Sequence, residues 1–270
     1  MMRYGFIGLG NMGGAILRGM IACGRFPAES VTGFDADARK VRAFAEEAGI
    51  KEAKDCAETA EDSDVIILAV KPQQLPGVLA EIAGVNRLTE KLFISIAAGF
   101  PIERIVSLLG QPSVSVIRAM PNLNAAVREA ITALCQDSPA SEEQFETARA
   151  VFESVGDVVM LPERQLGVFS AVAGASPAFT FMYADALAMA GVQAGLPRDL
   201  SVRIALQAVK GSAVNAVGSS EHLDSLRDRV CSPGGTTIEG VAVLEENGFK
   251  GIVMDAIRAV IDKDDMLSGR

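Results

Sequence analysis

The sequence predicts an α/β protein in which an N-terminal Rossmann domain, built on a doubly wound sheet, precedes an all-α domain. A glycine-rich motif directly follows the first apolar strand, and apolar strands then alternate with amphipathic helices. Strand patterns stop near residue 162, after which only helical patterns remain. We therefore expect an NAD(P)-binding domain at 1–162 and a helical dimerisation and substrate-binding domain at 163–270.

The strands expected in the first domain are short and apolar, as parallel strands buried on both faces should be. They lie at 3–7, 30–35, 62–70, 91–99, 113–120, 131–135 and 155–161. Helices are expected after the glycine-rich motif and at 35–49, 73–83, 101–109 and 141–153. Such alternation produces right-handed crossover units.

The second domain is expected to contain five helices, at 177–194, 198–217, 221–229, 236–247 and 249–264. The helix at 177–194 is apolar nearly all round, with Asp185 as its only charge. A helix of this kind must be buried on all sides, and so short a domain can hardly surround it. The pattern therefore favours an intertwined homodimer, with burial inside one chain as the alternative.

The composition argues against several kinds of partner and site. The net charge of −9 and a pI near 4.8 argue against a nucleic-acid partner. Four scattered cysteines and one histidine argue against a structural zinc site and fit a reducing cytoplasm. The N-terminus does not read as a signal peptide, and no uncharged run of 18 apolar residues occurs, so no membrane segment is expected.

The motif Gly8-Leu9-Gly10-Asn11-Met12-Gly13 predicts a dinucleotide site, because it joins a strand to a helix and is followed by an acid, Asp35, at the end of the next strand. In this pattern Gly8 allows a tight turn, Gly10 lets the backbone approach the pyrophosphate, and Gly13 lets the helix pack on the strand. Asp35 would accept hydrogen bonds from the adenine ribose. The expected cofactor is NAD(P)H, with NADH favoured and NADPH tolerated.

A nicotinamide cofactor implies hydride transfer, and few side chains here could donate a proton to a nascent alkoxide. The candidates are His222, Tyr4, Tyr183 and Lys210. A protonated imine already carries its proton, so its reduction needs positioning and electrostatics rather than a strong acid. The scarcity of acids favours an imine substrate.

A second anion-binding loop is predicted near the C-terminus, at Ser232-Pro233-Gly234-Gly235-Thr236-Thr237. It precedes the helix expected at 236–247, and the backbone N–H groups of such loops bind anions. The pattern alone leaves the identity of this anion open.

Together, these motifs resemble the pyrroline-5-carboxylate reductase family over nearly the whole chain. The resemblance rests on FIGLGNMGGAI at 6–16, AVKPQ at 69–73, SIAAG at 95–99, MPN at 120–122, GLPRDL at 195–200 and EHLDSLRDRVCSPGGTTIEG at 221–240. It implies reduction of Δ1-pyrroline-5-carboxylate to L-proline, the last step of proline biosynthesis, in a cytoplasmic enzyme. It also implies a helical domain that dimerises by interleaving, often within a decamer.

The resemblance further implies roles for individual residues. The 232–237 loop of the neighbouring subunit would hold the substrate, with Thr237 bonded to the ring nitrogen. The remaining substrate contacts would be Ser232, Gly234, Gly235, Thr236, Met120 and Asn122, with Pro121 nearby. The cofactor would contact Gly8, Gly10, Asn11, Met12, Gly13, Asp35, Ala69, Val70, Lys71, Pro72 and Ala97.

The chain departs from the family pattern at three places. Leu123-Asn124 replaces Thr-Pro, Ala173–Phe179 replaces SGSGPAY, and Cys56 stands where relatives often have asparagine. These departures leave open a reductase of another cyclic imino acid, such as a piperideine carboxylate. A β-hydroxyacid dehydrogenase would need asparagine at position 213, which is alanine. A non-catalytic NAD(P)-binding protein is the remaining alternative, and the intact 232–237 loop argues against it.

Overall fold

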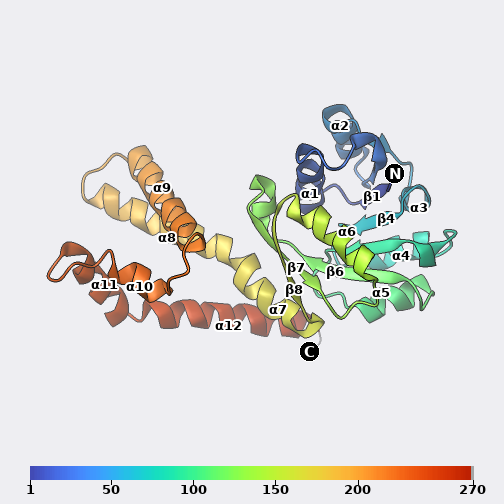
Figure 1. Cartoon of the computed structure of the whole chain (residues 1–270). Coiled ribbons are helices and arrows are strands. Elements are labelled where there is room, and N and C mark those ends of the chain that lie inside the picture. The colour runs from blue at the N-terminus through green and yellow to red at the C-terminus, as the bar shows by residue number, and fades with distance from the viewer. Residues whose placement is uncertain (269–270) are drawn as a thin grey trace. The chain divides into compact units, whose positions relative to one another are not determined.

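The computed structural model describes residues 1–268, with side chains through residue 266. The chain forms two compact units, drawn in Figure 1. The first contains Met1–Gly174 together with the chain from Ile261 onward, and the second contains Ala175–Val260.

The first unit is built on one eight-stranded sheet with the order β3-β2-β1-β4-β5-β6-β7-β8. All seven expected strands are present, and the fold class is confirmed. Their bounds are β1 Tyr4–Ile7, β2 Val31–Phe34, β4 Val65–Leu68, β5 Leu92–Ser95, β6 Ser115–Met120, β7 Ala130–Cys135 and β8 Gly156–Leu161. The eighth strand, β3 at Lys51–Glu52, is a two-residue edge pairing with β2 that leaves no sequence pattern.

The expected helices between the strands are also present. Their bounds are α1 Asn11–Ala22, α2 Ala38–Ala48, α4 Leu75–Ile82, α5 Ile102–Leu109 and α6 Glu142–Glu153. An unexpected short helix, α3, spans Cys56–Glu61 and begins where the Asp55 carboxylate accepts the Glu58 N–H at 2.8 Å. Such a cap satisfies one of the free donors of the first turn.

The sheet departs from a purely parallel arrangement at one place, because β7 runs antiparallel to β6. The connection from Met120 to Ala130 holds only the 3-10 helix η3, Leu123–Val127. A parallel crossover needs a dozen or more residues, so this connection is too short for one. Parallel pairing resumes between β7 and β8, which α6 connects.

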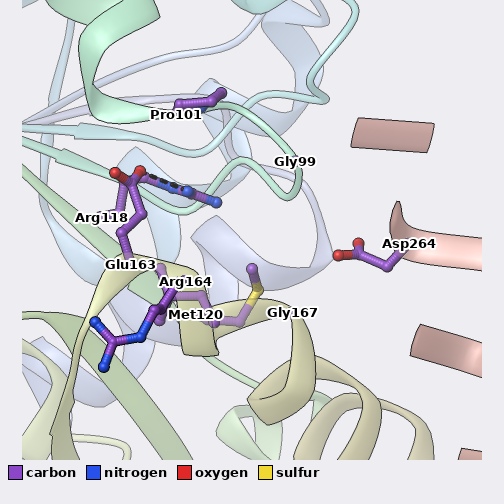
Figure 2. Close-up of a pocket in the computed structure, with 9 residues that line it drawn as sticks. Gly99, Pro101, Arg118, Met120, Glu163, Arg164, Gly167 and Asp264 are labelled. Carbon is purple, nitrogen blue, oxygen red and sulfur yellow. Dashed lines mark hydrogen bonds and ion pairs between the residues drawn. The ribbon is translucent and has the colours of Figure 1, made fainter. Parts of the chain in front are cut away.

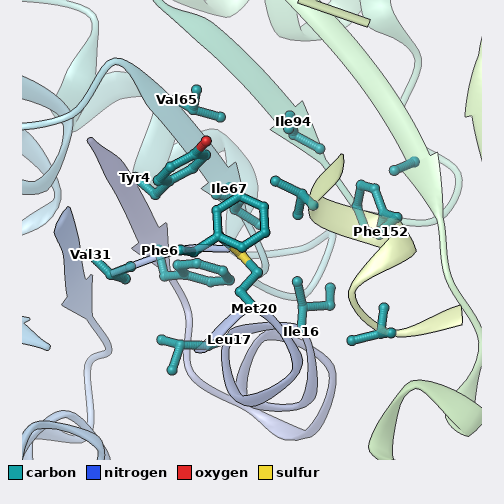
Figure 3. Close-up of a cluster of buried hydrophobic side chains, with 14 of the residues drawn as sticks. Tyr4, Phe6, Ile16, Leu17, Met20, Val31, Val65, Ile67, Ile94 and Phe152 are labelled. Carbon is teal, nitrogen blue, oxygen red and sulfur yellow. The ribbon is translucent and has the colours of Figure 1, made fainter. Parts of the chain in front are cut away.

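Two buried apolar clusters cover the two faces of the sheet, since successive strand residues point to opposite sides. On one face, Figure 3 shows Phe6 of β1 against Ile16 and Met20 of α1, with Phe152 of α6 close by. On the other face Ile7 and Phe93 pack with α3, α4 and α5. Burying each side chain of this size stabilises the folded state by roughly 2 kcal/mol. The sheet therefore holds the loops at its edge in fixed positions.

The second unit is helical, as expected. Its helices are α8 Ala175–Gln193, α9 Arg198–Val217, α10 Leu223–Asp228, α11 Thr236–Glu246 and the first part of α12 Phe249–Ser268. In a single chain the apolar side chains of α8 are exposed, by 58% at Phe181 and 71% at Met182. The burial predicted for this helix is therefore not supplied by one chain.

The segment that joins the sheet to α8 is helical too, although no helix is expected there from the sequence. It contains η4 Glu163–Gln165, α7 Leu166–Phe169 and a π-helical turn, η5, at Ser170–Gly174. These residues belong to the first compact unit. Short π-helical turns occur frequently at functional sites.

Candidate functional site

The glycine-rich loop lies where the strand order reverses, at the carboxyl ends of β1 and β4, the position at which open α/β sheets bind ligands. Gly8 has φ +102°, and a Cβ there would lie 2.7 Å from the Ala69 carbonyl. A Cβ at Gly13 would collide with the Gly8 carbonyl oxygen, whereas one at Gly10 would meet no heavy atom of the described residues within 4 Å. The loop is thus tight toward the sheet and open at Gly10.

The open side faces the N-terminus of α1, whose first residues are Asn11 and Met12. Its N-cap is Gly10, which has no side chain to satisfy the free N–H groups of the first turn. Free N–H groups and the helix dipole together favour an anion at this end. The geometry suits a pyrophosphate.

A cavity of about 530 Å³ opens beside this loop. Six of the eleven cofactor contacts expected from the sequence line it, namely Gly8, Gly10, Asp35, Ala69, Val70 and Lys71. The other five, Asn11, Met12, Gly13, Pro72 and Ala97, do not. Pro72 lies in a turn before α4, which begins at Leu75 and has Pro76 at its second position. The cavity wall also contains Cys56, one of the departures noted in the sequence, and residues that the motifs do not indicate, among them Phe34, Lys40, Gln74 and Glu81.

Asp35 makes structural hydrogen bonds that the sequence motifs do not indicate. Its carboxylate accepts the Leu9 N–H at 2.8 Å and the Asp37 N–H at 2.9 Å, so it fastens the glycine-rich loop to the end of β2. Lys40 approaches the same carboxylate at 3.3 Å. Because the side chain is only 13% exposed, the negative charge is held at the cavity wall in one position.

Cys56 lies at the wall of the same cavity and is buried. Burial, together with the neighbouring Glu81 carboxylate, raises the pKa of its thiol to about 12. The side chain is therefore a neutral thiol at physiological pH. It presents a small apolar surface to the cavity.

The other expected contacts of the first unit lie at the ends of β5 and β6. Ala97 is buried just beyond β5, and Met120 ends β6. Asn122 is buried too, and its side-chain amide donates to the Ala173 carbonyl of η5 at 3.0 Å. Its Oδ1 has no hydrogen-bond partner within the described part of the chain.

Met120 lines a smaller cavity of about 250 Å³, shown in Figure 2. Gly99 and Pro101 contribute from the loop after β5, and Arg118 and Glu163 form an ion pair at its wall. Neither charged residue is indicated by the motifs.

The second predicted anion-binding loop lies in the helical unit and has the expected form. Gly234 has φ +67°, a left-handed conformation that favours glycine. Gly235 is the N-cap of α11, and Thr236 and Thr237 are its first two residues. Ser232 accepts the Gly235 N–H through its carbonyl at 3.0 Å, so the loop turns tightly and leaves the helix N-terminus open.

Two of the four candidate acids are held in structural positions. Tyr4 is buried in the core at a ring-centroid distance of 5.2 Å from Phe26, and burial raises its pKa. His222 is the N-cap of α10 and accepts the Asp224 N–H at 3.4 Å. Tyr183 of α8 lies 6.3 Å from the Phe249 ring, and Lys210 is on α9.

Comparison with known proteins decides the family. A family model described as pyrroline-5-carboxylate reductase dimerisation matches residues 163–267, and one described as NADP oxidoreductase, coenzyme F420-dependent, matches residues 3–99. The chain is 38% identical to the pyrroline-5-carboxylate reductase of Escherichia coli over 98% of both chains. It is 41% identical to that of Synechocystis over 96% of this chain and 95% of the relative. The chain belongs to the pyrroline-5-carboxylate reductase family.

Solved structures of pyrroline-5-carboxylate reductases share the fold over the full length. The Coxiella burnetii protein superposes with a TM-score of 0.92 at 32% identity, covering 98% of each chain. The Plasmodium falciparum protein, solved with NADP bound, gives a TM-score of 0.86 at 29% identity over 99% of this chain and 98% of the relative. These matches support NAD(P)H as the cofactor of the reductase described here.

The dimerisation match covers the exposed α8, so the family assignment supports a homo-oligomer. Within residues 1–268, one helical stretch, Glu163–Gln193, is long and apolar enough to cross a membrane. The stretch nevertheless contains three charged residues, Glu163, Arg164 and Asp185. The whole stretch lies within the matched dimerisation region, where contact between subunits would cover its apolar surface.

Proposed function

We propose that this chain reduces Δ1-pyrroline-5-carboxylate to L-proline with NAD(P)H. The observation that carries this proposal is the presence, in a member of this family, of two separate helix N-termini, each preceded by a glycine N-cap without a capping side chain. The loop before α1 suits a pyrophosphate, and the loop before α11 suits the carboxylate of a small substrate. A dinucleotide-binding protein without such a substrate has no use for the second loop.

The first loop and the cavity beside it are assigned to the cofactor. Gly8, Gly10 and Gly13 give the loop its shape, and Asn11 and Met12 offer N–H groups to the pyrophosphate. The contacts with the rest of the cofactor are assigned to Asp35, Ala69, Val70, Lys71, Pro72 and Ala97. The fixed carboxylate of Asp35 favours ribose hydroxyls over a 2′-phosphate, so NADH is the preferred form.

The second loop is assigned to the substrate and is supplied by the neighbouring subunit. Ser232, Gly234, Gly235 and Thr236 hold the substrate carboxylate against the N-terminus of α11, and Thr237 hydrogen-bonds the ring nitrogen. Met120 and Asn122 complete the pocket from the sheet side. The buried Oδ1 of Asn122 supports this role, since a buried acceptor without a partner is costly unless a ligand satisfies it.

The chemistry then requires little from the protein beyond positioning. NAD(P)H, when bound, supplies the hydride that reduces the carbon of the protonated C=N bond. Thr237 holds the ring nitrogen, which keeps its proton as the C=N bond becomes single. The α11 N-terminus neutralises the substrate carboxylate and fixes the ring orientation. The two candidate acids in structural positions, Tyr4 and His222, take no part.

The assembly is proposed to be an intertwined homodimer formed by the helical part of the chain, residues 163–270, with 1–162 as the NAD(P)-binding domain. The exposed apolar surface of α8 supports this pairing. The dimers are proposed to assemble further into a decamer, as the family resemblance implies. The enzyme is assigned to the cytoplasm, without a nucleic-acid or membrane partner. The net charge of −9 supports the absence of a nucleic-acid partner, because a negatively charged protein is repelled by phosphate backbones.

The test is oxidation of NADH and NADPH by the purified protein with Δ1-pyrroline-5-carboxylate, with L-proline identified as the product. Rescue of a proline auxotroph by the gene is the matching result in cells. Failure of both would contradict the proposal. Cofactor binding without turnover would favour a non-catalytic NAD(P)-binding protein.

One alternative substrate class has a specific observation behind it. Leu123 stands beside the pocket residue Asn122, where the family pattern has threonine, and its side chain is 54% exposed. An altered pocket edge of this kind fits a six-membered piperideine carboxylate as well as the five-membered ring. Comparing kcat/KM for the two rings separates these substrates.

A further inference from the structure

The ion pair between Glu163 and Arg118 joins segments that are far apart in the sequence. One oxygen of Glu163 accepts from Arg118 Nη1 at 2.7 Å and from the Ile102 N–H at 3.0 Å. The N–H of Glu163 itself donates to the Asp137 carboxylate at 2.7 Å. A single residue of η4 is therefore bonded to α5, to β6 and to the loop after β7.

The bond to Ile102 replaces a missing helix cap. Ile102 is the first residue of α5, and the N-cap position before it is Pro101, which has no acceptor side chain. Glu163, 61 residues away, supplies that acceptor. Because its charge is negative, it also interacts favourably with the N-terminal end of the helix dipole. This fixes the loop between Ala97 and Pro101.

The bond to Arg118 fixes the end of β6. Arg118 is 9% exposed and precedes Met120 by two positions, so both side chains lie on the same face of the strand. Figure 2 shows the paired charges on one side of the cavity and Met120 across from Gly99. Charge-assisted hydrogen bonds to a largely buried guanidinium are among the stronger ties available to a protein.

The two segments fixed in this way both carry proposed site residues. Ala97 precedes the loop held through Ile102, while Met120 and Asn122 follow the strand held through Arg118. The segment 163–174 begins with Glu163, and near its other end the Ala173 carbonyl accepts a hydrogen bond from Asn122. Sheet pairing of β5 with β6 ends at Ser95 and Arg118, and the carboxylate of Glu163 adds a tie between the segments that follow the two strands.

We propose that Glu163, through Arg118 and Ile102, is a positioning residue for hydride transfer. It touches neither cofactor nor substrate, and it acts by holding the Ala97 loop and the Met120–Asn122 strand end at the distance that the reaction needs. The inference rests on the proposed function. A displacement of about 1 Å between reacting groups can cost about 100-fold in rate.

The test compares Glu163→Ala, Glu163→Gln and Arg118→Met in the full-length protein with Δ1-pyrroline-5-carboxylate. We expect Glu163→Ala to lower kcat about 30-fold while KM for NAD(P)H stays within about twofold, because the pyrophosphate loop is untouched. The deuterium isotope effect on kcat, measured with cofactor labelled at the transferred hydrogen, should increase. Glu163→Gln should retain most of the rate, since its amide oxygen still accepts from Ile102 and Arg118.

Coupling and exchange measurements separate positioning from a general loss of stability. If the pair acts as a unit, the Glu163→Ala/Arg118→Met double variant should be no slower than the slower single variant. Amide hydrogen exchange at Ile102 should speed up in Glu163→Ala. Glu146→Ala, which breaks the exposed Glu146–Arg149 pair of α6, is the matched control and should change none of these quantities.

Three results would overturn the proposal. Unchanged kcat and isotope effect in Glu163→Ala would remove its role, and so would a defect confined to KM for the cofactor. If Glu163→Ala does not fold, an unchanged kcat in Arg118→Met would also overturn the proposal. Absence of turnover in the unsubstituted protein would instead contradict the proposed function itself.

Discussion

Thr237 is the side chain to which the account gives the most direct part in the reaction. It occupies the second position of α11, in the first turn of the helix. The sequence places it there correctly, because proline and paired glycines before an apolar helical pattern predict an open helix N-terminus. Glu163 and Arg118 could not be found in this way, since a pair 45 residues apart leaves no local pattern.

The variant Thr237→Ala tests this assignment. Losing one hydrogen bond to the reacting nitrogen should raise the activation free energy by about 1–3 kcal/mol, mainly through kcat. Steady-state kinetics measure the effect, and Thr237→Ser, which keeps a hydroxyl, is the control. A rate in Thr237→Ala equal to that of the unsubstituted protein would remove this residue from the mechanism.

Among the helices and strands, the sequence predicts long regular elements correctly. It predicts neither very short strands nor the direction in which a strand runs. The 20-residue helix α9 begins and ends where its pattern does, at Arg198 and Val217. The two-residue β3 is too short to show alternation, and the direction of β7 follows from the length of its connection rather than from its residues. Helix α4 begins at Leu75, two residues after the start predicted at residue 73, because residues 72–74 form a turn.

The contact between α1 and α2 gives a prediction that depends on pH. Arg18 of α1 donates to both oxygens of Glu47 of α2, at 2.8 and 3.0 Å, and this bonding holds the pKa of Glu47 below its usual 4.5. A carboxyl whose pKa is lower in the folded state stabilises that state above its unfolded pKa, and the contribution is lost as pH falls through the folded value. The pair is solvent-exposed, so its contribution should be below about 1 kcal/mol.

Urea unfolding at fixed protein concentration measures this contribution. Glu47→Gln should lower the unfolding free energy at pH 7, and the difference from the unsubstituted protein should vanish at a pH well below 4.5. A difference that persists unchanged at low pH would show that the ion pair is not its source.

The proposed reaction depends on a second copy of the chain. The family model and the exposed apolar residues of α8 both indicate subunit contact through the helical part. The apolar sequence of the helix expected at 177–194 predicts such contact, because a helix without a polar face needs partners on every side. The substrate loop before α11 is proposed to serve the neighbouring subunit, so assembly and activity should be lost together.

Met182→Glu tests that link, since Met182 is 71% exposed in a single chain and lies on α8. A buried, unpaired charge in the interface should dissociate the dimer and abolish turnover, while NADH binding by the first unit remains. Analytical ultracentrifugation and NADH fluorescence titration measure the two properties. Val127→Glu, at a residue of η3 that is 69% exposed, is the matched control and should leave the dimer intact.

The central claim is that two anion-binding helix ends bring a nicotinamide and a five-membered cyclic imino acid together. Steady-state kinetics with Δ1-pyrroline-5-carboxylate and with its six-membered homologue, each with NADH and NADPH, test it most directly. The account predicts stoichiometric formation of L-proline, a higher kcat/KM for the five-membered ring, and a preference for NADH. Oxidation of neither cofactor with Δ1-pyrroline-5-carboxylate, or faster turnover of the six-membered ring, would contradict it.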